Sequence, residues 1–176
     1  MASQTNPNKE IKIEKVTFNF GAGKDQSMLE KGVKLIEYLT GVAPVKTKAS
    51  KRIPAWGLRP GLPIGCKLTI RDKAKVDDFV RRFLKAKANN LKKSNFDHQG
   101  NVAFGVHEYI DIGGVKYNPE LGLMGLQFCI TLRRNGYRVK KRKIMKVKTL
   151  PPTHQITQDD AIEFMKQKYN VTVEEN

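Results

Sequence analysis

The sequence predicts an α+β protein, an antiparallel sheet with helices packed on one face, plus a basic β-ribbon. Two observations support this prediction. Segments in which apolar and polar residues alternate recur along the chain, and stretches with apolar residues at helical spacing lie between or after them. The 176 residues show no internal repeat and no change of composition that would mark a boundary, so we expect residues 1–176 to form a single domain.

The first part of the chain predicts three strands and one helix. Residues 11–20 end in a clear alternation and predict a strand. Residues 25–41 predict a helix, with an Asp at the start that is suited to cap it and a Gly at the end that is suited to stop it. Residues 44–50 predict a second strand, and residues 66–71 alternate strictly and predict a third. Residues 48–65 are rich in Pro and Gly and predict a loop, because such a segment fits neither a helix interior nor a central strand.

The second part predicts two helices, two strands and the ribbon. Residues 73–91 have an apolar stripe on an otherwise basic helix, and strands are expected at 102–110 and 126–134. An Asn-Gly pair follows the second of these strands and is a hairpin signal, so residues 133–149 are predicted to form the basic ribbon. A Thr with an Asp three positions later is close to a capping box and opens a helix over residues 158–169, after which the chain is expected to fray.

Positive charge dominates the composition. Lys and Arg number 33 against 17 Asp and Glu, which gives a formal net charge of +16. Self-repulsion of that size favours an anionic partner, with nucleic acid as the first candidate and an anionic membrane surface as the second. No apolar run approaches the about 18 residues of a membrane span, and the polar N-terminus lacks the apolar stretch of a signal peptide. Cys66 and Cys129 stand alone in alternating segments and are expected to be buried, reduced thiols, which indicates a cytoplasmic protein.

Two long spans without an acidic residue concentrate this charge. One runs from Leu39 to Arg71 and the other from Leu121 to Gln158. Solvated surfaces usually mix both signs, so phosphate binding is the favoured interpretation and an ordinary solvated face is the alternative. The cations of the loop in the first span are Lys48, Lys51, Arg52 and Arg59. The cations expected to bind phosphates in the second span are Arg133, Arg134, Arg138, Lys140, Lys141, Arg142 and Lys143.

The outward residues of the predicted strands add groups that suit RNA. If the strands share one sheet, its outer face carries cations for phosphate, and hydroxyl and amide groups for sugars and base edges. This mixture fits the shallow minor groove of RNA with its 2′-hydroxyls, and a plain solvated sheet face is the alternative. The face would hold Lys15, Thr17, Asn19, Lys67, Thr69, Arg71, Gln127 and Thr131.

The loop at residues 48–65 has the features of an RNA-binding finger. Its three prolines stiffen it, which lowers the entropy cost of binding. Trp56 can stack on a base or a ribose, and Arg59 can hold a phosphate beside it. The alternative for a lone Trp is a packed core aromatic.

Catalytic and metal-binding patterns are absent from the sequence. His98, His107 and His154 are scattered, and none stands beside Ser or Cys in a nucleophile motif. The GAGK stretch at residues 21–24 lacks the glycine spacing and the final Ser or Thr of a nucleotide-binding loop. We therefore expect no enzyme, no cofactor and no metal site.

Three stretches in a fixed order connect the chain to a known family. They are IEKVTFNFGAGK at residues 13–24, TKASKRIPAWGLRPGLPIGCKLTIR at 47–71 and NFDHQGNVAFGV at 95–106. Together they resemble the family of large-subunit ribosomal protein five, the 5S rRNA-binding protein of the central protuberance, over about residues 10–170. The stretches RRNGYRVKKRK and HQITQDDAIEFMKQKYNV are similar to the archaeal and eukaryotic branch of that family.

The resemblance implies a structural role on the cytoplasmic ribosome. It implies binding to 5S rRNA and large-subunit rRNA, a contact between the loop and P-site tRNA, and contacts with neighbouring ribosomal proteins of the central protuberance and the small-subunit head. Family positions that meet 5S rRNA fall here on Asn19, Trp56 and Thr69, and we expect Lys67 and Arg71 to take part beside them on the outer face. A valine at position 42 stands where bacterial members often carry a polar Gln, so the 5S footprint is expected to differ in detail.

Other functions remain open at this point. The charge alone permits a free RNA chaperone or a tRNA-binding module equally well, and the ordered motifs favour the ribosome over both. An RNA-modifying enzyme would need a nucleophile, a metal or a cofactor loop. A membrane-surface protein would need a basic amphipathic helix, and the apolar stripe of residues 73–91 is needed for the core.

Overall fold

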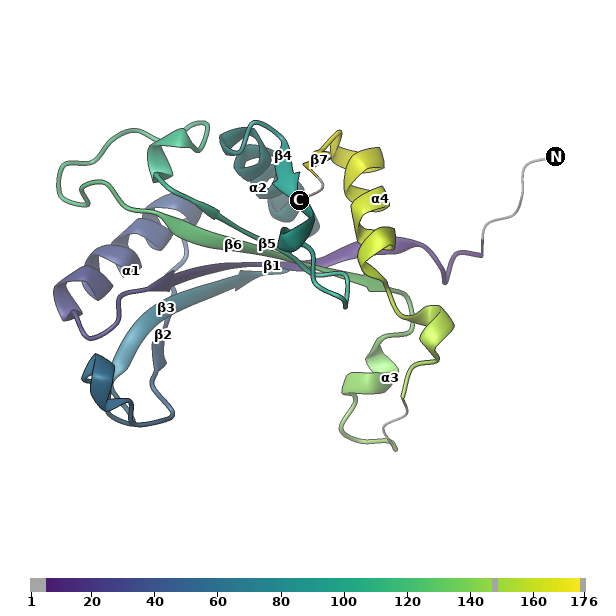
Figure 1. The fold of residues 1–176 in the computed structure, drawn as a ribbon, viewed down its shortest axis with the longest axis horizontal. Coiled ribbons are helices and arrows are strands. Elements are labelled where there is room, and N and C mark those ends of the chain that lie inside the picture. The colour runs from purple at the N-terminus through teal and green to yellow at the C-terminus, as the bar shows by residue number, and fades with distance from the viewer. Residues whose placement is uncertain (1–5, 147–148, 175–176) are drawn as a thin grey trace.

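Five strands, in which apolar and polar side chains alternate, form one antiparallel sheet that runs across the middle of the molecule (Figure 1). The computed structural model describes residues 6–146 and 149–174; residues 147 and 148 of the predicted ribbon lie outside this range. The strand order is β2-β3-β1-β6-β5. These strands are β1 (Ile11–Gly21), β2 (Val45–Lys48), β3 (Pro63–Ile70), β5 (Val102–Val106) and β6 (Leu126–Arg134). The predicted α+β class and antiparallel sheet are confirmed.

The apolar face of the sheet packs against helices. These are α1 (Gln26–Thr40), α2 (Lys73–Ala86) and α4 (Gln158–Tyr169), which lie on one side of the sheet (Figure 1). Phe18 at the centre of the sheet is fully buried. Its ring meets Phe79 and Phe83 of α2 edge-on at centroid distances of 5.2 and 5.4 Å, and Phe128 of β6 at 5.2 Å. Because such aromatic contacts stabilise beyond their buried area, they fix α2 on the sheet.

The helix ends follow their capping residues. Asp25 accepts hydrogen bonds from two backbone N–H groups in the first turn of α1, and Gly41 ends the helix in a left-handed conformation with φ of 69°, as predicted. The helix α2 ends at Ala86, well before the predicted residue 91. The chain leaves the helix because Ala88 and Asn89 adopt left-handed conformations with φ of 51° and 55°.

The C-terminal segment is ordered by a second, smaller sheet. Thr157 and Asp160 form the predicted capping box at the start of α4. Beyond that helix, β7 (Thr172–Glu174) pairs in parallel with β4 (Asn90–Lys92). The prediction of a frayed tail is therefore wrong for residues 172–174. Short 3₁₀ turns occur at η1 (Pro54–Trp56), η2 (Lys93–Asn95), η3 (Tyr109–Asp111) and η4 (Pro152–His154), and η3 replaces the end of the strand predicted at 102–110.

Between Asn135 and Met145 the chain forms no strand, so the predicted basic β-ribbon does not form in this described stretch. Gly136 takes a φ of 90°, and the chain enters the short helix α3 (Arg138–Lys141). The Tyr137 hydroxyl donates to the carbonyl of His154 at 3.2 Å and accepts from the N–H of Ile156 at 3.0 Å. These hydrogen bonds hold the segment against the residues that lead into α4, in place of pairing with β6.

Candidate nucleic-acid interface

Rows of polar side chains cross the sheet on the side opposite the helices. We call this surface the open face; its residues are Lys15, Thr17, Asn19, Lys67, Thr69, Gln127, Cys129 and Thr131. In one row Asn19 lies between Lys67 and Gln127, and all three are exposed. The Asn19 amide donates to the side-chain oxygen of Gln127 at 3.0 Å. A cation and a pair of carboxamides therefore lie side by side, and Arg71 is exposed just beyond the end of β3.

The next row contains hydroxyl groups and one thiol. Thr17 lies between Thr69 and Cys129, and the two Thr hydroxyls are 3.4 Å apart. Cys129 is half-buried on the open face, so the prediction that it is a core thiol is wrong, whereas Cys66 is fully buried as predicted. Both thiols are free. Burial raises the pKa of both, and that of Cys66 to about 11, so they stay protonated at neutral pH.

In the loop at residues 48–65, the tryptophan side chain points into solvent. Trp56 is 68% exposed at the end of η1, which excludes the alternative of a packed core aromatic. Behind it, Ile53 and Leu58 exchange backbone hydrogen bonds of 3.1 Å in both directions, and Leu58 is buried. The loop is therefore closed by its own backbone and presents Trp56 in a defined conformation. Its exposed cations are Lys48, Lys51, Arg52 and Arg59.

The cations predicted to bind phosphate at residues 133–143 divide into two groups. Arg134 is 3.1 Å from the Asp160 carboxylate and Lys141 is 3.1 Å from the Glu14 carboxylate, so both are engaged inside the protein. Arg142 donates to a nearby backbone carbonyl. The remaining members are exposed and make no ion pair within the described part of the chain; they are Arg133, Arg138, Lys140 and Lys143. These four constitute the free basic group of this segment.

A cavity beside α3 is the feature that the sequence did not reveal. It has a volume of about 300 Å³ and lies between Glu14, residues 99–101, the end of β6 and residues 149–156. No sequence signal indicates it, because it exists only when the segment after β6 folds back instead of extending as a ribbon.

Residues 6–146 and 149–174 contain neither of two other kinds of site. No group of three or more His, Cys, Asp or Glu side chains there could hold a metal ion. No helix in the same ranges is both long and apolar enough to cross a membrane.

Two family models match most of the chain. The one described as Ribosomal protein L5 covers residues 6–59, and the one that describes the C-terminus of the same ribosomal family covers residues 63–164. The chain belongs to the ribosomal protein L5 family. Its five-stranded sheet joins both matched parts, since β1 and β2 lie in the first and β3, β5 and β6 in the second.

Three similar L5-family proteins come from archaea, and each is a large ribosomal subunit protein uL5. That of Sulfolobus acidocaldarius is 44% identical over 172 residues, which is 98% of this chain and 96% of the relative. That of Sulfurisphaera tokodaii is 42% identical over 171 residues, 97% and 96% of the two chains. That of Methanococcus maripaludis, strain DSM 14266, is 44% identical over 170 residues, 95% and 93%.

Membership of the L5 family tests several of the predictions made from the sequence. The family resemblance and its archaeal side are confirmed. The family consists of structural ribosomal proteins, so the predictions of a ribosomal, rRNA-binding protein that is not an enzyme are confirmed, as is its location on the cytoplasmic ribosome.

Proposed function

We propose that this chain is a structural constituent of the large ribosomal subunit that binds 5S rRNA in the central protuberance through the open face. The observation that carries the proposal is the row of Lys67, Asn19 and Gln127 on the open face of an L5-family chain with a net charge of +16. Lys67 and Arg71 supply cations for phosphates, whereas Asn19 and Thr69 supply groups that can bond to 2′-hydroxyls or base edges. The exposed ring of Trp56 in the loop at residues 48–65 adds a surface on which a base or a ribose can stack.

In this proposal, the basic group near α3 and the loop at residues 48–65 bind further partners. The free basic group near α3 binds phosphates of 5S rRNA or large-subunit rRNA, because its members are exposed and not neutralised by neighbouring carboxylates within the described residues. Trp56 and the loop cations contact P-site tRNA. Neighbouring ribosomal proteins of the central protuberance and the small-subunit head complete the assembly. Residues 1–176 act as one domain, which fits a sheet that draws strands from both matched parts of the family.

A salt titration of RNA binding tests the proposal. The affinity for 5S rRNA is measured against salt concentration, with bulk tRNA as the comparison ligand. Purely electrostatic binding falls along a slope set by the number of phosphates neutralised, about 0.9 per phosphate on a duplex. We expect 5S rRNA binding to persist at salt concentrations where the tRNA signal is lost. Two equally steep slopes would favour the alternative, a free RNA chaperone or tRNA-binding module.

A double variant tests the open face itself. Asn19→Ala combined with Thr69→Ala removes an amide and a hydroxyl without changing charge. It should weaken 5S rRNA binding by about 1–3 kcal/mol if one or two desolvated hydrogen bonds are lost, while the salt slope stays the same. Gln167→Ala is the matched control, because it removes an exposed amide from α4 and not from the sheet. Unchanged 5S affinity in the double variant would remove the open face from the interface.

A further inference from the structure

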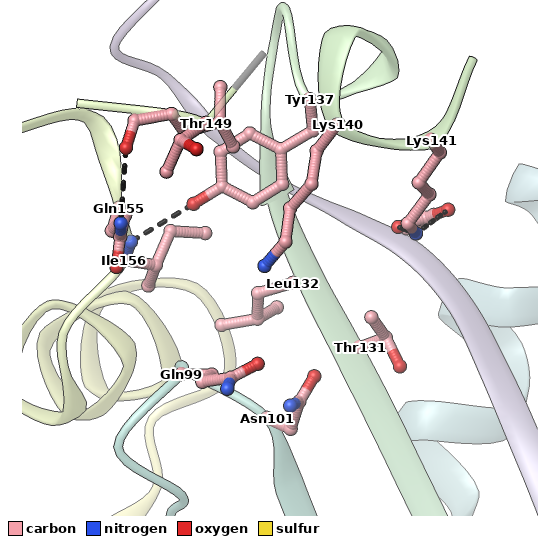
Figure 2. A pocket seen from close by; sticks show the side chains of 12 residues that line it. Gln99, Asn101, Thr131, Leu132, Tyr137, Lys140, Lys141, Thr149, Gln155 and Ile156 are labelled. Atoms are coloured by element: carbon pink, nitrogen blue, oxygen red, sulfur yellow. Dashed lines mark hydrogen bonds and ion pairs between the residues drawn. The ribbon is translucent and has the colours of Figure 1, made fainter. Parts of the chain in front are cut away.

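The cavity beside α3 is built like a small-ligand site. Its volume of about 300 Å³ is at the lower end of the ~300–1,000 Å³ that ligand pockets usually have. Leu132 and Ile156 are buried and supply apolar floor, and the ring of Tyr137 stands at one side (Figure 2). The hydroxyl of Tyr137 is held by two hydrogen bonds, which fixes its ring in this place.

Some of the polar groups in the wall are already engaged by the protein. The Lys141 amine contacts both Glu14 carboxylate oxygens at 3.1 and 3.2 Å, which neutralises the one acidic side chain of the lining. The Gln155 amide donates to the carbonyl of Leu150 at 3.2 Å. An anionic ligand would therefore meet no unpaired carboxylate in this cavity.

Other polar groups of the wall have no protein partner within the described residues. Lys140, Gln99 and Thr131 make no side-chain hydrogen bond or ion pair there, and Asn101 uses its amide nitrogen for Asp97 and keeps its oxygen as an acceptor. Figure 2 shows the Lys140 amine pointing into the space between Tyr137 and Gln99, with Asn101 and Thr131 beyond. A cation, a carboxamide, a hydroxyl and an aromatic ring thus face one small volume.

This combination matches the parts of a nucleotide. An ammonium group binds phosphate, a carboxamide can pair with two atoms on the edge of adenine, and an aromatic ring stacks on any base. The cavity also adjoins the open face: Gln99, Asn101 and Thr131 line both the cavity and a shallow depression over the sheet that includes Lys15 and Cys129. An RNA lying on the open face therefore passes the mouth of the cavity.

We propose that this cavity takes one unpaired nucleotide, with its base against Tyr137 and Gln99 and its phosphate on Lys140, supplied by the RNA that lies on the open face. The inference rests on the proposed RNA-binding function and adds to it a site for a base that has left its stack. Among the four bases, adenine suits the Gln99 carboxamide best, because that amide can donate to N7 and accept from N6.

A titration with mononucleotides tests the cavity without any ribosomal RNA. The ¹⁵N-labelled protein is titrated with AMP, GMP, CMP and UMP, and its backbone amide shifts are followed by NMR, with ribose 5-phosphate and inorganic phosphate as control ligands. We expect saturable shifts at residues 99–101, 131–132 and 137–141, strongest with AMP and absent with inorganic phosphate. Shifts that inorganic phosphate reproduces, or that spread over exposed lysines elsewhere, would overturn the site.

Charge-matched variants sharpen this result. Lys140→Met should weaken AMP binding by about tenfold, because a charge-assisted hydrogen bond to phosphate is lost. Lys143→Met removes an exposed charge from the same segment outside the cavity lining and should change AMP affinity less than about twofold, within measurement error. Gln99→Ala should reduce the preference for AMP over the other nucleotides. Equal effects of the two lysine variants would overturn the assignment of Lys140.

An RNA arm distinguishes a nucleotide within RNA from a free one. Lys140→Met combined with Gln99→Ala should weaken 5S rRNA or large-subunit rRNA binding more than Lys143→Met does at the same salt concentration. If AMP binds but both variants bind each RNA alike, the RNA source of the nucleotide is wrong and the cavity takes a free nucleotide. A further outcome is that AMP binds the cavity but neither rRNA stays bound at salt concentrations where bulk tRNA is released. The proposed function would then be wrong, while the nucleotide site in the cavity would stand.

Discussion

Arg133 and Arg134 are neighbours at the end of β6, but their side chains lie in opposite environments. Arg133 is exposed and makes no ion pair within the described residues. The Arg134 side chain is only 12% exposed, with Nη2 3.1 Å from Asp160 Oδ2. Its Nη1 is 3.2 and 3.4 Å from the carbonyl oxygens of Gln155 and Thr153. Arg134 therefore joins β6 to the segment that leads into α4.

Replacing Arg134 with alanine removes a donor from all three acceptors, and among the described residues only Asp160 Oδ2 keeps another one, the backbone N–H of Thr157 at 3.0 Å. Breaking a fully buried ion pair costs about 3–5 kcal/mol, but the Asp160 side chain is 33% exposed and water can replace part of the interaction. We therefore expect Arg134→Ala to lower the free energy of unfolding by about 2–3 kcal/mol. Arg133→Ala is the matched control and should stay within about 0.5 kcal/mol of the parent protein. Urea unfolding followed by circular dichroism measures both.

In RNA binding, the larger effect should come from Arg133 and not from Arg134. Arg133→Ala should lower the salt slope of rRNA binding by about 0.9, the contribution of one phosphate contact. Arg134→Ala, measured where the variant is still folded, should leave the slope unchanged. The reasoning is refuted if Arg134→Ala is as stable as Arg133→Ala, or if it lowers the salt slope as Arg133→Ala does.

Two further predictions concern the loop and the contact between α2 and α4. Trp56→Ala should leave the free energy of unfolding within about 0.5 kcal/mol, because the ring is 68% exposed, and should weaken tRNA binding by about 1–3 kcal/mol; lost stability with unchanged tRNA affinity would contradict it. Tyr169→Phe removes the hydroxyl that donates to Asp77 at 2.7 Å and should cost about 1 kcal/mol at neutral pH. The hydrogen bond from Tyr169, followed by that from Arg81, lowers the pKa of Asp77, so this stabilisation is present above the ordinary carboxyl pKa and is lost as the pH falls through the lowered value. Urea unfolding at several pH values should therefore show a smaller acid-induced loss for Tyr169→Phe than for the parent protein, and equal losses would exclude Asp77 as the linked group.

The sheet could be predicted from the sequence because each strand has one face in the core. The same alternation that buries Phe18 and Phe128 turns Asn19 and Gln127 to the open face, so most residues of that face follow from one rule. Cys129 was assigned to the core from its residue type, although its position in the alternation is an outward one. Position in the pattern was the better guide there.

The ribbon and the cavity could not be predicted, because both depend on contacts between distant segments. The Asn-Gly pair is a local hairpin signal, and it is outweighed by hydrogen bonds that Tyr137 makes with His154 and Ile156. The wall of the cavity brings Glu14 and Gln99 together with residues of the segment after β6. No periodicity in any one stretch contains that information.

The position of β1 in the sheet has a consequence for the newly made chain. It is the first strand to be synthesised and the central strand of the sheet, and its neighbours β3 and β6 are both made later. One edge of β1 can pair as soon as β3 emerges, but the other keeps its N–H and C=O groups unpaired until β6, which begins at Leu126. An unpaired edge beside an apolar face invites pairing with another chain. A nascent chain released between β5 and β6 would therefore have β2, β3 and β1 available to pair, while one side of its central strand stays open to any copy nearby.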